Sequence, residues 1–485
     1  MGRITRNYIY NLAYQLLVLI APLITAPYLA RVLGASNLGI YSYVKSSGNI
    51  ITTISLLGIY AYGNRQTAYV RDNKNKLTKS FWEIELTRLV LGSIGTLIYL
   101  IYSYFNKEQS FNFIIFYPYI LAEFIDCSWI YVGLEDMKPA VIKNFVTKIA
   151  NIVGIFVFIH DRDDVWIYII LLATTTLIAN ISVYTQLPQY INAPRGEGKP
   201  EPKNILSHIK GSTYLFLPQV ASLFYLQVDK VMLKWLTGET AQVSFYDNAE
   251  RMINIPLSII MVISTVMMPR IANEFQKNNK EAIQSLLLKA GRFALLMTFP
   301  LMIGLFCISQ QFIPWYLGEE FLPTASTMMI LTPIVLFNAL AGISGAQYFT
   351  ATNQINILLK AYSIAAVFNV IVNAILIPRL GYVGAAIATV GSSFLSVVTQ
   401  YFYMNKQVNM RPLVKYGIKY FCGGLIMGIA IFAVTRNNPA RPITTIIQII
   451  VGVAIYGAYI LLIRDQAVLE IIEKIKMRFH IGEEQ

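Results

Sequence analysis

Three charged side chains, Asp229, Lys230 and Lys234, interrupt the run 212–236, which is otherwise apolar enough to cross a bilayer. A charged side chain at the centre of a membrane helix costs about 2.5–3.5 kcal/mol on insertion scales, so three that face lipid would cost roughly 8–10 kcal/mol. Such a helix can exist only if its charges face a hydrated interior. In a membrane protein, a charged interior is typical of a transporter of polar solutes.

Further charges lie near corresponding ends of the apolar runs that begin the two halves of the chain. They are Arg31 and Lys45 in the first half, and Asp247, Glu250 and Arg251 in the second. We expect Lys45 or Arg31 to pair with a carboxylate of the second half and so to close the outer mouth of the interior. The candidate carboxylates are Asp229, Asp247 and Glu250. Alternatively, these side chains extend into the headgroup region and have no further role.

Two carboxylates, Glu123 and Asp126, lie near the middle of the fourth apolar run. They are three residues apart, so we expect them to share one helix face. Carboxylates within a membrane are typical of proton relays and of coupling-ion sites. We therefore predict a cation or proton site here, with nearby basic residues attracting an anionic headgroup. The structural alternative is pairing within the same half, and the basic residues concerned are Arg88, Lys143 and Lys148.

The composition indicates a polytopic membrane protein. The 485 residues are 55% hydrophobic and 13% charged, with a mean hydropathy of +0.53, whereas soluble domains carry about 25% charged residues. A net charge of +13 would suggest nucleic acid as a partner of a soluble protein. Here the positive charges fall mostly in alternate loops, so we expect none. The three cysteines and three histidines form neither a disulfide framework nor a metal site.

Hydropathy in a window of about 19 residues predicts an all-α fold of about fourteen transmembrane helices. Their approximate bounds are 8–31, 38–63, 84–105, 112–134, 141–160, 165–187, 210–236, 244–268, 290–312, 323–347, 357–378, 382–404, 414–435 and 442–463. Lysines and arginines concentrate in the loops at 65–79, 195–203, 270–289 and 406–415. By the positive-inside rule these loops are cytoplasmic, and so are both termini.

A linker composition divides the chain, because the stretch 192–203 contains three prolines and two glycines. We expect two pseudo-symmetric six-helix lobes around a central cavity, a plan that many transporters share. Short matches between the halves support this plan: Ala30–Gly34 before Gly39–Tyr41, and Lys234–Gly238 before Ser244–Tyr246. The predicted parts are 1–190, the cytoplasmic linker 191–209, 210–405, two further helices at 406–463, and a cytoplasmic tail at 464–485.

Two absences argue against an enzyme. The sequence lacks a Gly-x-x-x-x-Gly-Lys-Ser/Thr phosphate loop, so ATP hydrolysis by this chain is not expected. The predicted outer loops are short and leave little room for a polymerase or glycosyltransferase platform.

Four stretches resemble the polysaccharide repeat-unit flippases of the Wzx group. They are Pro27–Gly34 with Gly39–Tyr41, Asp126–Trp129 with Gly133–Glu135, Gln227–Val231 with Tyr246 and Pro269–Arg270, and Asn373–Ala388. Their order and spacing cover nearly the whole chain. The resemblance implies the fold of the multidrug, oligosaccharidyl-lipid and polysaccharide exporter superfamily, with alternating access to a central cavity.

The resemblance also implies a substrate and a place of action. The substrate would be an undecaprenyl-pyrophosphate-linked oligosaccharide, flipped from the inner to the outer leaflet of the cytoplasmic membrane for capsule or exopolysaccharide assembly. Polysaccharide polymerase and other capsule-assembly proteins would be partners, and no cofactor is implied beyond Na⁺ or H⁺ as a coupling ion. In this view Lys45, Lys230 and Arg88 bind the pyrophosphate, and Arg31 and Arg251 are further cavity cations.

Two other transporters remain open as alternatives. A cation-coupled multidrug efflux pump would share the fold but usually has twelve helices and an acidic cavity. A lipid II flippase would share the fourteen helices and the basic interior, and the Asp126–Trp129 stretch favours the capsule group over it. A structural membrane protein would not account for charges at the depth of the hydrocarbon.

Overall fold

The computed structural model describes the backbone of residues 3–192, 196–465 and 468. Side chains are described over the same ranges except for residues 3–16, 197, 214, 215, 217–226, 259 and 261–266. All regular elements within these ranges are helices, and none is a strand. The prediction of an all-α protein is thus confirmed.

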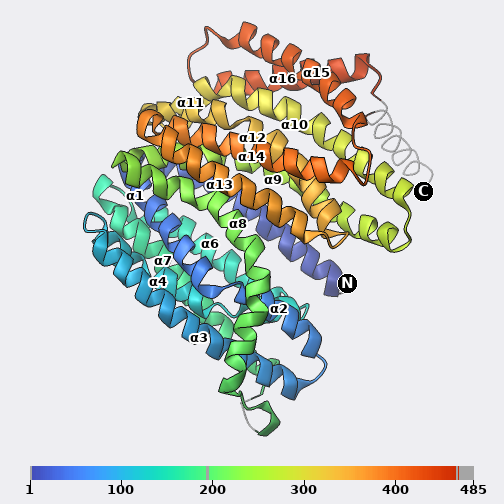
Figure 1. Ribbon diagram of the computed structural model, residues 1–485. Coiled ribbons are helices and arrows are strands. Elements are labelled where there is room, and N and C mark those ends of the chain that lie inside the picture. The colour runs from blue at the N-terminus through green and yellow to red at the C-terminus, as the bar shows by residue number, and fades with distance from the viewer. Residues whose placement is uncertain (1–2, 193–195, 466–467, 469–485) are drawn as a thin grey trace, which may run out of the picture. The chain divides into compact units, whose positions relative to one another are not determined.

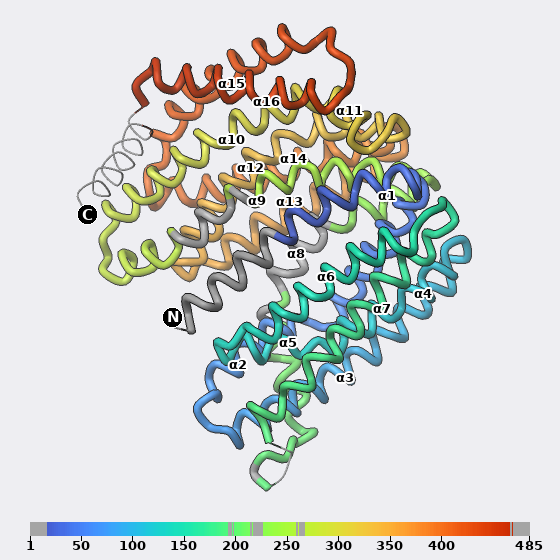
Figure 2. The backbone as a smooth tube through the Cα atoms, turned by 180° about the vertical axis from the view of Figure 1, so that it is seen from behind, coloured from blue at the N-terminus to red at the C-terminus, as the bar shows by residue number. Residues whose placement is uncertain are grey.

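The chain separates into two compact units, Met1–Ser244 and Phe245–Gln485, whose helices are drawn in Figures 1 and 2. The first contains α1 (Arg3–Leu56), α2 (Ile59–Val70), α3 (Lys74–Phe105), α4 (Ser110–Ile125), α5 (Ser128–Gly133), α6 (Lys138–Phe158), α7 (Val165–Tyr184), α8 (Ile205–Thr237) and the start of α9 (Thr240–Gln276). The second continues with α10 (Lys280–Tyr316), α11 (Leu322–Leu331), α12 (Pro333–Ala341), a π-helical segment (Gly342–Thr350), α13 (Ile355–Leu380), α14 (Tyr382–Asn405), α15 (Pro412–Thr435) and α16 (Pro442–Leu462).

Every predicted span coincides with a helix or with a helix that is broken. The first two spans form α1, which changes direction at Gly34, where φ is 74° and ψ is 174°. The fourth span is α4 and α5, separated by Asp126 and Cys127. The tenth is α11, α12 and the π-helical segment, with a bend of 47°. In the described part of the chain, ten helices are long and apolar enough to cross a membrane, or eleven if this bent pair is one span.

The outer surfaces of the helices are apolar, as a lipid solvent requires. Large side chains such as Leu97, Ile429 and Val453 are at least 60% exposed, which would be costly in water but not in hydrocarbon. The protein is therefore a multi-pass membrane protein.

The linker between the predicted lobes packs against the first unit. Its short helical turns, Gly196–Gly198 and Pro202–Asn204, lie against α3, and α8 contacts α1, α2 and α3. The compact units thus divide at Ser244, beyond the predicted linker 191–209. The predicted lobes were defined by a repeat in the sequence, whereas the compact units are defined by contacts. The bounds of the lobes therefore stay a prediction.

Candidate functional site

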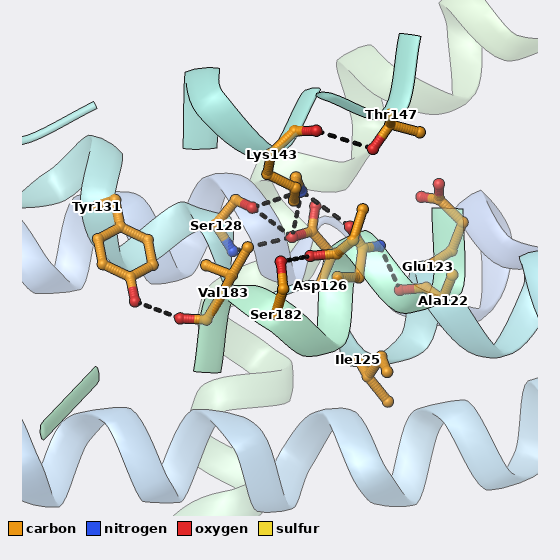
Figure 3. A network of polar contacts seen from close by, with 12 residues as sticks. Ala122, Glu123, Ile125, Asp126, Ser128, Tyr131, Lys143, Thr147, Ser182 and Val183 are labelled. Atoms are coloured by element: carbon orange, nitrogen blue, oxygen red, sulfur yellow. Dashed lines mark hydrogen bonds and ion pairs between the residues drawn. The ribbon is translucent and has the colours of Figure 1, made fainter. Parts of the chain in front are cut away.

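A break in the fourth membrane span organises a polar network inside the first unit (Figure 3). Helix α4 ends at Ile125 because Asp126 has extended backbone angles, with φ −69° and ψ 102°. The Oδ1 atom of Asp126 accepts hydrogen bonds from the backbone N–H of Ser128 at 3.0 Å and from its hydroxyl at 2.5 Å. The carboxylate thereby satisfies a donor at the start of α5, in the manner of a helix cap.

The break also leaves carbonyls at the end of α4 without helical partners. Within a membrane such groups must be satisfied by the protein itself. Asn180 of α7 donates to the carbonyl of Ala122 at 2.8 Å. The hydroxyl of Tyr184 lies 2.7 Å from the carbonyl of Ile125, and Nη2 of Arg88 donates to that of Glu123 at 3.1 Å. Side chains of α3 and α7 therefore stabilise the interrupted span.

Lys143 of α6 supplies the positive charge of this network. Its Nζ atom donates to Asp126 Oδ1 at 3.0 Å, to Ser128 Oγ at 2.7 Å and to Asn180 Oδ1 at 2.9 Å. These three acceptors use all the donors of an ammonium group, and the Lys143 side chain is only 6% exposed. Asp126 is thus neutralised within its own unit, as the structural alternative in the sequence analysis expected.

Arg88 is also neutralised locally. Its guanidinium contacts Glu85 Oε1 at 2.9 Å, one turn earlier on α3, and the residue is 2% exposed. Glu85 was absent from the sequence-derived candidates, although its spacing of three residues from Arg88 predicts such a pair. Asn180 was missed as well, and an amide within an apolar run was the available signal. In this conformation the contacts of Arg88 position α4.

Glu123 differs from Asp126. The expectation that the two carboxylates share a helix face is wrong, because α4 ends between them. In Figure 3 the Glu123 carboxylate lies apart from the Asp126–Lys143 pair. It is half-buried and hydrogen-bonded to the hydroxyl of Tyr119. Within the described residues no ion pair joins it to a cation, so it can titrate or bind a cation without dismantling the network.

The charges of α8 are turned away from lipid. Asp229 is 1% exposed, Lys230 8% and Lys234 6%. The Nζ atom of Lys234 lies 2.8 Å from both carboxylate oxygens of Glu108 and 2.7 Å from the carbonyl of Gly238. This ion pair, which the sequence analysis missed, joins the end of α8 to the turn between α3 and α4. It holds the pKa of the Glu108 carboxyl below its usual value.

The remaining candidates come from both units. Lys45 is half-buried, with its ammonium 5.5 Å from the ring centre of Tyr41. The exposed Arg31 donates to the carbonyl of Pro27 on its own helix at 3.1 Å. In the second unit, Asp247 pairs with Arg251 one turn later on α9 at 2.7 Å. Glu250, between them in sequence, is half-buried. Pairing between the lobes stays a prediction.

Comparison with known proteins identifies the family. The family described as "Polysaccharide biosynthesis protein" matches residues 4–275, more than half of the chain. The chain belongs to this family. The family "Lipid II flippase MurJ" matches residues 141–451. The predicted resemblance to Wzx-type flippases is confirmed, and this flippase is a transporter rather than an enzyme.

Individual relatives agree with this assignment. A protein of Escherichia coli (strain K12) named "Putative O-antigen transporter" is 23% identical over 402 residues, which cover 80% of this chain and 94% of the relative. A Haloferax volcanii protein named "Probable low-salt glycan biosynthesis flippase Agl15" is 25% identical over 213 residues, 44% of this chain and 45% of that protein.

Solved structures share the fold. The lipid II flippase MurJ in an inward closed conformation has a TM-score of 0.75 at 20% identity and covers 94% of this chain and 99% of its own. An inward-facing multidrug resistance MATE transporter has a TM-score of 0.65 at 16% identity and covers 86% and 99%. These similarities confirm the exporter-superfamily fold, and fourteen membrane helices are consistent with it.

Proposed function

We propose that this flippase moves undecaprenyl-pyrophosphate-linked oligosaccharide repeat units from the inner to the outer leaflet of the cytoplasmic membrane, for capsule or exopolysaccharide synthesis. The similarity to the Escherichia coli O-antigen transporter relative, over 80% of the chain, carries this proposal. The buried charges of α8 support it, since their insertion cost requires polar surroundings. Polysaccharide polymerase and other capsule-assembly proteins would act beside it.

The cations Lys45, Lys230 and Arg88 would bind the pyrophosphate, and Arg88 would have to leave Glu85 and the carbonyl of Glu123 to do so. Arg31 and Arg251 would add positive charge nearer the helix ends. Asp229, Asp247 and Glu250 would pair with such cations to close the outer mouth when the substrate is absent.

The driving force would be electrical, with an ion gradient as an addition. A membrane potential contributes about 2.3 kcal/mol per charge per 100 mV. Outward movement of a pyrophosphate with roughly two negative charges is therefore favoured by about 4–5 kcal/mol at 100 mV, negative inside. Exchange for Na⁺ or H⁺ would use Glu123, because its carboxylate has no cation bound to it among the described side chains. Asp126 already has Lys143.

The proposed orientation places both termini and the basic loops in the cytoplasm. Four loops rich in lysine and arginine alternate with loops that contain few of them, as the positive-inside rule requires. Substrate would thus enter from the leaflet in which repeat units are assembled.

The decisive experiment is reconstituted transport. The protein in liposomes should flip a fluorescent undecaprenyl-pyrophosphate oligosaccharide, measured by chemical quenching of the outer-leaflet label, and do so faster under a membrane potential. Lys45→Glu should impair flipping, and Asp229→Lys in the same chain should partly restore it. Lys107→Glu, an exposed charge reversal in the α3–α4 turn, is the matched control and should leave flipping unchanged.

A lipid II flippase is the second candidate, because the MurJ family matches 141–451 and MurJ shares the fold. The same liposomes should be given fluorescent lipid II. Faster flipping of lipid II than of the oligosaccharide would overturn the proposed substrate. Export of a cationic dye with no flipping of either lipid would favour a drug pump.

A further inference from the structure

A basic pocket in the second unit is formed by residues other than the candidate charges considered above. It is lined by Arg292 of α10, Lys415, Tyr416 and Lys419 of α15, and Arg464, which follows α16. Its volume is about 480 Å³. A second hollow shares Arg292 and Tyr416 and adds Lys289 and Glu281. The three helices lie side by side in both views (Figures 1 and 2).

One buried carboxylate arranges the floor of this basic pocket. The side chain of Asp465 is fully buried, and it contacts Arg292 at 2.8 Å and Lys419 at 2.9 Å. It also accepts a hydrogen bond from the hydroxyl of Tyr420 at 2.9 Å. Arg292 is fixed further by stacking, with its guanidinium 4.8 Å from the ring centre of Tyr416. The two inner cations are therefore held in place before any ligand arrives.

The positive charge of the pocket exceeds what Asp465 can compensate. Four cations line it, and one carboxylate balances one of them. Lys415 and Arg464 make no ion pair with a described residue. A concave site with several cations, two of them preorganised, suits a phosphate group, because guanidinium and ammonium groups bind its oxygens by charge-assisted hydrogen bonds.

These cations lie near the ends of their helices, at the depth in the bilayer where lipid headgroups lie. Lys415 and Lys419 lie in the first two turns of α15, and Arg464 follows the end of α16 at Leu462. Arg292 precedes the far end of α10, Tyr316, by about 36 Å at 1.5 Å per residue. Hydrocarbon spans about 30 Å and the whole bilayer about 40–45 Å. All four cations thus lie at one headgroup level.

The surface beside the pocket is apolar and open to lipid. Val414 and Ile418 of α15 are 65% and 62% exposed, and Leu462 of α16 is 82% exposed. Acyl chains attached to a phosphate in the pocket can lie against these side chains. A free phosphate would gain nothing from this surface, so the combination favours a lipid.

We propose that this pocket binds the phosphate headgroup of an anionic membrane lipid, with Lys415 and Arg464 as the main contacts and Arg292 and Lys419 as a preorganised floor. The inference depends only on membrane insertion and not on the proposed substrate. The bound lipid would fix α15 and α16, the two helices outside the predicted six-helix lobes, against α10.

The test is a titration of the purified full-length protein in detergent, followed by native mass spectrometry. Phosphatidylglycerol should bind saturably and more tightly than phosphatidylcholine. The K415Q/R464Q variant keeps the Arg292–Asp465–Lys419 contacts and should bind phosphatidylglycerol about thirtyfold more weakly, the change expected from about 1 kcal/mol per basic residue at an anionic surface. The K74Q/K76Q variant removes the same charge from an exposed part of α3 and should bind like the unaltered protein.

Two results would overturn the proposal. Equal weakening in both variants would mean that overall charge, rather than this pocket, attracts the lipid. Displacement of phosphatidylglycerol by millimolar inorganic phosphate would show a site for a free anion instead of a lipid headgroup. Melting temperatures of both variants, measured in the same detergent, identify any loss of binding that comes from unfolding.

Discussion

Lys143 Nζ lies 3.0 Å from Asp126 Oδ1 at the point where α4 gives way to α5. Removing one partner of a buried ion pair leaves the other charge uncompensated, at a cost of about 3–5 kcal/mol. We expect Lys143→Met to lower stability by about 3 kcal/mol, because Asp126 would also lose its only ion-pair partner among the described residues. Thermal unfolding in detergent measures this. Lys138→Met, at an exposed position at the start of the same helix, is the control, and equal melting temperatures for the two variants would contradict the structural role.

Glu123 should behave in the opposite way, with an effect on transport and little on stability. Its carboxylate lies outside the Lys143 network, so Glu123→Gln should leave the melting temperature unchanged. If Glu123 is the coupling carboxylate, the substitution should reduce ion-stimulated flipping about tenfold or more and abolish its dependence on the Na⁺ or H⁺ gradient. Flipping driven by membrane potential alone should persist. A variant that responds to both gradients like the unaltered protein would exclude the coupling role.

Hydropathy was sufficient to predict the membrane helices but not the breaks within them. The spans are long apolar runs, so the insertion energy alone predicts them. The break at Asp126 depends on Asn180, Tyr184 and Arg88, which lie far away in sequence and satisfy the carbonyls that it frees. No local pattern around Asp126 contains that information. Ion pairs at helical spacing, such as Glu85 with Arg88, can be predicted from the sequence. The pair of Lys234 with Glu108 joins residues far apart in the sequence and can be found only from the fold.

The linker between the predicted lobes should be held by a buried histidine. His208 Nε2 contacts Glu83 Oε2 at 3.1 Å, and Nδ1 contacts the hydroxyl of Tyr62 at 2.9 Å. Glu83 Oε1 accepts from the backbone N–H of Glu201 at 3.0 Å and from Asn204 at 2.7 Å. We expect Glu83→Ala to release this segment, because its donors lose a common acceptor.

Limited trypsin digestion measures that release, since Lys203, which precedes Asn204, provides a cleavage site in the linker. Cleavage there should be at least several times faster in Glu83→Ala than in the unaltered protein. Glu239→Ala, at an exposed site before α9, should be cleaved at the normal rate. Identical linker cleavage in all three proteins would show that Glu83 does not hold the segment.

Acid should weaken the contact between Lys234 and Glu108. Lys234 lowers the pKa of Glu108 below its usual value, which is about 4.3 in an unfolded chain. A carboxyl whose pKa is lower in the folded state stabilises that state above the unfolded pKa, and this contribution disappears as the pH falls through the folded pKa. The Glu108→Gln variant should therefore melt below the unaltered protein at pH 6, and the two melting curves should converge below about pH 4. A difference that is constant from pH 6 to pH 3 would mean that the contact is not ionic.

The turn inside α1 should require glycine. Gly34 has φ 74° and ψ 174°, a combination that is essentially restricted to glycine and costs other residues about 1–3 kcal/mol. Gly34→Ala should thus either destabilise the protein by about this amount or change the direction of the second part of α1, where Lys45 lies. Gly457→Ala is the matched control, because it is helical and its added methyl group would meet no atom within 4 Å. Alanine favours a helix by up to about 1 kcal/mol over glycine, so the control should melt at the same temperature or higher. Equal melting temperatures and equal flipping in both variants would show that the chain does not need this backbone conformation.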